Sequence, residues 1–113
     1  MRSVRMLFLF VDGVGLGDMD PATNPFVRGR TPTLRALLGQ PLAGRDPVGT
    51  DAATLLPLDA RLGVSGLPQS ATGQTALLTG ENAPALLGRH VTAYPTPTLR
   101  TLLASHGVFV RLG

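Results

Sequence analysis

The feature that most constrains the fold is a nearly unbroken run of apolar, β-favouring residues at positions 4–11. Such a run does not alternate between apolar and polar positions, which is typical of a strand covered on both faces in a parallel sheet. Residues 12–30 then contain four Gly, two Pro and four Asp or Asn, and they predict a long loop. A second β-favouring run covers residues 108–112, and residues 54–60 form a plausible short strand, which Pro57 would confine to an edge or a bulge.

Helix signals separate these strands. Thr31 and Thr96 each stand before a Pro, as N-caps do, and Gly39, Gly80 and Gly88 stand where helices end. The sequence therefore predicts helices over residues 31–39, 72–78, 84–87 and 96–103. The order β, α, β, α, β predicts an α/β fold with a mostly parallel sheet flanked by helices.

Composition narrows the classes of function. The 113 residues, 43% of them apolar, are enough for one small domain spanning residues 1–113. No apolar run reaches the roughly 18 residues of a membrane span, and the first segment lacks a signal-peptide cleavage site, so we expect a cytoplasmic protein with no membrane partner. The chain has no cysteine, which excludes disulfides and thiolate metal sites. Its net charge of +3 comes from arginines that are scattered singly and form no basic stripe. The chain also has a single Tyr, so basic and aromatic residues do not alternate, and we expect no nucleic-acid partner.

Two polar residues stand at positions suited to phosphate chemistry. Asp12 follows the first predicted strand and precedes Gly13 and Gly15, which would let a ligand approach the backbone closely. Ser70 lies in a Gly- and Pro-rich turn before a predicted helix, where backbone N–H groups favour an anion. Each has a structural alternative: Asp12 as the side chain of an Asx-turn, and Ser70 as a helix N-cap.

A serine needs a base, a lowered pKa or a metal to become a nucleophile. Neither His90 nor His106 has a spacing that makes it a base for Ser70, so metal coordination is the remaining route. A carboxylate and a hydroxyl in these positions suit metal-assisted phosphoryl transfer. Other phosphate motifs are excluded: the glycines at 13, 15 and 17 do not open a helix, and a chain without Lys has no Walker motif.

Four segments, in this order, resemble the amino-terminal part of the alkaline phosphatase superfamily. They are Leu-Phe-Val-Asp-Gly-Val-Gly at 9–15, Asn-Pro-Phe at 24–26, Thr-Pro-Thr-Leu at 31–34 and Gly-Leu-Pro-Gln-Ser-Ala-Thr-Gly-Gln at 66–74. Within the superfamily they are most similar to the branch that contains cofactor-independent phosphoglycerate mutase and phosphopentomutase. The resemblance covers residues 4 to about 82. It implies an alkaline-phosphatase-like parallel sheet, of which residues 1–113 would be the amino-terminal portion.

The resemblance also implies roles for individual residues. Asp12 would ligate one of two divalent metal ions, Mn or Zn with Mg as a further option. Ser70 would bridge to the metal and accept the phosphoryl group, with Thr72 as the alternative nucleophile. Gln74 stands where the mutases have His. This departure argues against mutase-like handling of the substrate. The family's remaining Asp and His ligands have no counterpart here, so the chain reads as one piece of a metalloenzyme.

The function implied is that of a phosphoryl or sulfuryl ester hydrolase, or a phosphomutase-like transferase, acting on a small phosphate ester. An inactive module that works through a partner is the main alternative. A Gly-rich nucleotide-binding module is a third reading.

Overall fold

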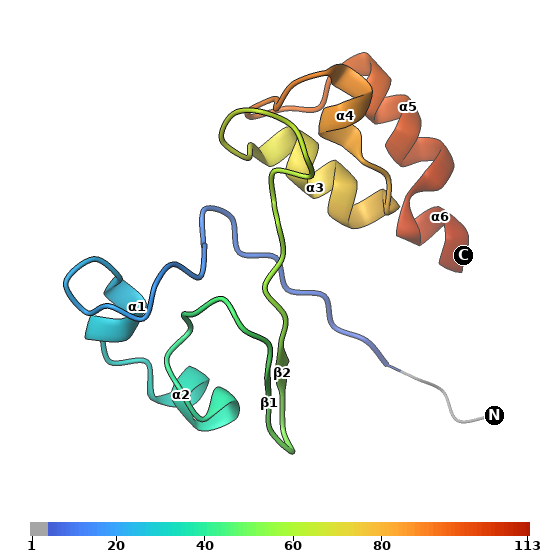
Figure 1. The fold of residues 1–113 in the computed structure, drawn as a ribbon. Helices are drawn as coiled ribbons and strands as arrows, with labels where there is room; N and C mark the ends of the chain where they lie inside the picture. The colour runs from blue at the N-terminus through green and yellow to red at the C-terminus, as the bar shows by residue number, and fades with distance from the viewer. Residues whose placement is uncertain (1–4) are drawn as a thin grey trace. The chain divides into compact units, whose positions relative to one another are not determined.

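The computed structural model describes residues 5–113 (Figure 1). The chain divides into two compact units, Met1–Leu58 and Asp59–Gly113. The first unit contains short helices and a small hairpin, whereas the second contains helices and loops over its whole length. Asp12 belongs to the first unit and Ser70 to the second.

In the first unit, two short helices are followed by two short strands. The helices are α1 (Pro25–Arg28) and α2 (Pro32–Leu38), and the strands β1 (Val48–Gly49) and β2 (Thr54–Leu55) pair antiparallel, with Val48 opposite Leu55. The helix predicted over 31–39 is confirmed, since α2 begins after Thr31 and ends before Gly39. The buried apolar residues among the described residues of the first unit are Leu38 and Ala43.

Asn24 organises the loop that precedes α1. Its side chain is buried, and its Oδ1 accepts a hydrogen bond of 3.0 Å from the backbone N–H of Phe26, which caps the helix. Its Nδ2 donates to the carbonyl oxygens of Leu16, at 2.7 Å, and Asp18, at 2.9 Å. One amide thus fixes both the start of α1 and the course of the chain about eight residues earlier.

The second unit packs three helices around a small core. They are α3 (Ser70–Thr79), α4 (Ala83–Leu87) and α5 (Pro97–His106), and a short helix, α6 (Val108–Leu112), follows. Helix α3 contacts both α4 and α5 (Figure 1). Ala71, Ala83 and Leu99 form the buried cluster, and Leu99 is 0% exposed. The helices predicted over 72–78, 84–87 and 96–103 are confirmed within α3, α4 and α5.

Helix α3 buries threonines rather than leucines. Thr72, Thr75 and Thr79 face the interior, whereas Leu77 is 52% exposed. The hydroxyl of Thr75 donates to the carbonyl oxygen of Ala71 at 2.7 Å, and that of Thr79 donates to the carbonyl oxygen of Thr75 at 2.7 Å. Because each hydroxyl bonds within the helix, the face is both small and free of unsatisfied donors, and neighbouring helices can pack closely against it.

The predicted fold class is wrong. Among residues 5–113 the strands are β1 and β2, which pair antiparallel, so the described chain has no mostly parallel sheet flanked by helices. The strand predicted over residues 54–60 is reduced to Thr54–Leu55. Of the strand predicted over 4–11, residue 4 lies outside the described residues, and residues 5–11 form neither helix nor strand.

The physical reason is that a strand requires a hydrogen-bonded neighbour, which sequence pattern does not supply. The run at 5–11 has the side chains of a buried strand, but no strand pairs with it in the described chain. The run at 108–112 forms α6 instead of a strand. There, Gly107 accepts hydrogen bonds from the backbone N–H groups of Val110 and Arg111, and contacts with α5 outweigh a β-propensity that depends strongly on context.

Candidate functional site

Ser70 is the first residue of α3. The N-cap position belongs to Gln69, whose backbone is extended and whose side chain makes no capping bond. Ser70 therefore occupies the first helical position rather than the cap, and its side chain is half-buried. Of the four hydroxyl residues in α3, it is the one that is not buried.

The backbone donors at the start of α3 are already used. The N–H groups of Ala71 and Thr72 both donate to the carbonyl oxygen of Val91, at 3.0 Å and 3.4 Å, and that of Gly73 donates to the carbonyl of Gln69 at 2.9 Å. The sequence predicts that such groups favour an anion. In the structure the carbonyl of Val91 takes two of them, so a bound anion would have to displace it.

Thr72, the alternative nucleophile, is 0% exposed and has a structural role. Its hydroxyl donates to the carbonyl oxygen of Gln69 at 3.3 Å and accepts from the backbone N–H of Val91 at 3.2 Å. These bonds hold the loop after α4 against the first turn of α3. Ser70 is consequently the more accessible of the two hydroxyls.

His90 supports the same region, a role that its sequence position does not reveal. Its side chain is half-buried, and its Nε2 lies 3.2 Å from the carbonyl oxygen of Val64. A carbonyl only accepts, so Nε2 carries the hydrogen in this bond. The contact links the segment after α4 to the loop that leads to Ser70. No spacing signal marks it, because Val64 is 26 residues away.

Gly73 leaves one side of the first turn of α3 open. A Cβ atom built at this position would meet no heavy atom within 4 Å. Gln74 follows Gly73 and is half-buried. Packing therefore does not require glycine at position 73, whereas close approach of a ligand would.

Asp12 lies in an exposed turn of the first unit. Within residues 5–113, no group of three or more His, Asp or Glu side chains is placed to hold a metal ion. Asp12 and Ser70 contribute one carboxylate and one hydroxyl, fewer donors than two divalent ions require. The described residues alone therefore do not fit a complete two-metal centre.

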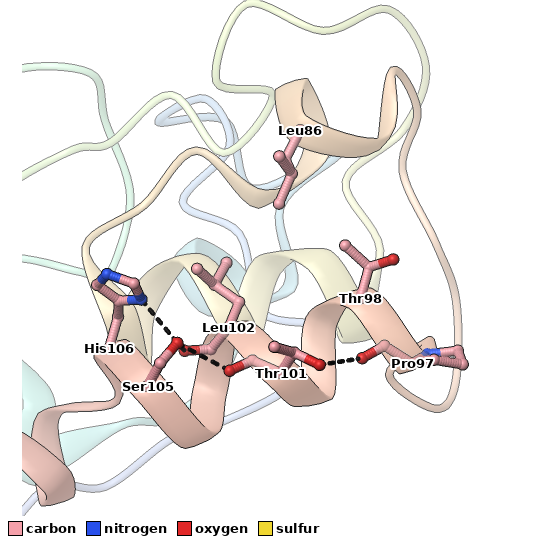
Figure 2. Close-up of a pocket in the computed structure, with 7 residues that line it drawn as sticks. All are labelled: Leu86, Pro97, Thr98, Thr101, Leu102, Ser105 and His106. Atoms are coloured by element: carbon pink, nitrogen blue, oxygen red, sulfur yellow. Dashed lines mark hydrogen bonds between the residues drawn. The ribbon is translucent and has the colours of Figure 1, made fainter.

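Ser105 and His106 line a surface groove of about 550 Å³ between α4 and α5. Figure 2 shows Leu86 pointing from α4 toward Leu102 on α5, with Ser105 and His106 at one end. Ser105 Oγ lies 2.8 Å from His106 Nδ1, and it also donates to the carbonyl oxygen of Thr101 at 2.9 Å. With its hydrogen directed to that carbonyl, the serine accepts from the imidazole, the reverse of a nucleophile and its base.

The chain matches no family model, no curated protein and no solved structure. The resemblance to the alkaline phosphatase superfamily therefore rests on the four sequence segments and stays a prediction.

Over residues 5–113, no helix combines the length and the apolar character needed to cross a membrane.

Proposed function

We propose that this chain takes part in metal-dependent phosphoryl or sulfuryl ester chemistry, as a hydrolase or a phosphomutase-like transferase, with Ser70 as nucleophile. The observation that carries the proposal is the contrast within α3. Its three threonines, Thr72, Thr75 and Thr79, are buried, whereas Ser70 at the helix start is only half-buried and so accessible to a substrate. The motif at 66–74 supports the same residue.

The proposed phosphoryl transfer has two steps. Ser70 Oγ would bond to the phosphorus of a small phosphate ester and expel the alcohol, which takes the serine's proton. Water, or a second hydroxyl of the substrate, would then accept the phosphoryl group and regenerate the serine. Thr72 and His90 would hold the loops on either side, and the open side of Gly73 would admit the substrate.

The proposal assigns Asp12 as one metal ligand; residues 5–113 supply no group of three or more His, Asp or Glu side chains that would complete the set. Two divalent ions, Mn, Zn or Mg, would neutralise the oxygens of the transferring group when bound. We also propose a cytoplasmic location.

The test uses protein expressed from its complete reading frame. Native mass spectrometry would report bound divalent ions, and turnover of phosphate and sulfate esters would be measured with Mn, Zn and Mg. We expect Ser70→Ala to abolish turnover and to leave the circular dichroism spectrum unchanged. Ser105→Ala is the matched control, since it removes a surface hydroxyl elsewhere in the second unit. Near-normal turnover by Ser70→Ala would refute the nucleophile, and absence of turnover in the parent protein with every ion would refute the function.

The inactive module remains the second candidate because one observation favours it. Large apolar side chains are exposed in both units, among them Leu7 at 90% and Phe109 at 74%. Such exposure is typical of surfaces that a partner covers.

A further inference from the structure

Three of the ten arginines come together in the first unit, although the sequence spaces them singly. Arg28 at the end of α1, Arg30 in the linker and Arg35 in α2 line one pocket of about 370 Å³. We call it the arginine pocket; its lining residues are Arg28, Gly29, Arg30, Thr31, Pro32 and Arg35. All three lie within residues 28–35, and the short connection between α1 and α2 brings them to one pocket.

No carboxylate neutralises these arginines in the described chain. The ion pairs among residues 5–113 join Arg45 to Asp18 and Arg111 to Glu81, and neither involves the pocket. Arg35 is nevertheless held in place, because its Nη2 donates to the carbonyl oxygen of Val27 at 2.7 Å and lies 3.5 Å from that of Gly29. Carbonyl oxygens orient a guanidinium without cancelling its charge. The pocket therefore has an ordered cation that lacks a counter-ion.

Thr31 adds a hydroxyl that has no partner. Its Oγ1 is buried and makes no hydrogen bond, and it does not cap α2 although Thr31 is the N-cap residue. A buried polar atom without a partner is rare in folded proteins, and it points to a missing ligand or water. Thr31 belongs to the same pocket lining as the three arginines.

We propose that the arginine pocket binds an oxyanion, namely the phosphate group of a small ligand. Guanidinium groups form paired, charge-assisted hydrogen bonds with phosphate oxygens, and a threonine hydroxyl donates one more. A volume of about 370 Å³ lies within the range of small-molecule sites. The proposal does not rest on the function proposed above, since it uses residues 28–35 and neither Asp12 nor Ser70.

The test measures binding of inorganic phosphate to the full chain in EDTA, by calorimetry and by the rise in melting temperature. Sodium chloride at equal ionic strength is the reference. We expect phosphate, and not chloride, to bind and to raise the melting temperature. Arg28→Gln and Arg30→Gln should each weaken phosphate binding about tenfold, the usual effect of losing one charged hydrogen-bond donor. Arg61→Gln and Arg89→Gln, exposed arginines of the second unit, should leave it unchanged.

Thr31→Val provides a readout that does not depend on charge. It should leave the free protein as stable as the parent or more so, while weakening phosphate binding. Ser70→Ala should bind phosphate normally, which separates this proposal from the proposed function. An equal response to chloride, or unchanged binding in both arginine variants, would overturn the proposal. A single-stranded DNA oligonucleotide that binds far more tightly than phosphate monoester at equal phosphate concentration would overturn the assignment to a small ligand.

Discussion

At the scale of single residues, polar side chains define the start of α3 more than apolar ones do. Thr72 bonds to both Gln69 and Val91, and His90 bonds to Val64, so the loop before α3 and the segment after α4 are held together where Ser70 lies. The sequence predicts the position of Ser70 at this helix start. It does not reveal that the carbonyl of Val91 occupies the neighbouring N–H groups, because that contact spans about twenty residues.

Gly73 permits a test that separates stability from function. Glycine inside a helix costs about 0.5–1 kcal/mol relative to alanine, and a Cβ here would meet open space. We expect Gly73→Ala to raise the free energy of unfolding by about that amount, measured by urea denaturation. If Ser70 is the nucleophile, the same variant should lose turnover, because the added methyl group narrows the approach to the serine.

Gly80→Ala, at the C-cap that follows the same helix, is the control. Gly80 has a φ of 74°, in the left-handed region, so a side chain there should destabilise the protein by about 1 kcal/mol. If Gly73→Ala destabilises the protein as much as Gly80→Ala does, the fold itself requires glycine at position 73.

At the scale of elements, the second unit is stabilised by close packing of small residues around one large one. Ala71 and Ala83 form the buried cluster with Leu99, and Ala76, Leu87 and Val91 pack against it. The start of α5 is fixed by Thr96, whose hydroxyl oxygen accepts from the backbone N–H of Leu99 at 3.3 Å. The capping residue therefore also places the central side chain of the core.

Leu99→Ala should remove most of this core. Truncating a fully buried leucine costs about 2–5 kcal/mol, a large part of the stability of a small domain. We expect the helical signal of the second unit to melt at markedly lower urea concentration. Leu77→Ala, which truncates a leucine that is 52% exposed, should change stability by about 0.5 kcal/mol or less. Equal effects of the two substitutions would contradict the assigned core.

At the scale of the whole molecule, the described chain leaves much apolar surface in contact with solvent. Residues 6–11 are all exposed, with Met6 at 86% and Leu7 at 90%, and no strand among residues 5–113 pairs with them. An unpaired apolar segment of this kind readily adds to another chain as a strand.

We therefore expect the chain to associate as its concentration rises. Sedimentation velocity over a hundredfold range of concentration would show this self-association. The double variant Leu7→Lys, Leu9→Lys should remain monomeric without loss of stability. Arg61→Lys serves as a surface control. A parent chain that stays monomeric throughout would contradict this expectation and would weaken the alternative that the chain acts through a partner.

The sequence by itself determined the local features: the four predicted helices, the glycines that end them, and the placement of Ser70 at a helix start. These features depend on residues a few positions apart, which capping and backbone preference govern. The tertiary structure alone decided the rest. Whether residues 5–11 and 108–112 become strands depends on partners distant in the chain, and the structure gives the first none and makes the second a helix. The gathering of Arg28, Arg30 and Arg35 depends on the conformation of the short connection between α1 and α2. The bonds from the start of α3 to the Val91 carbonyl depend on how helices and loops pack, a non-local outcome that spacing does not encode.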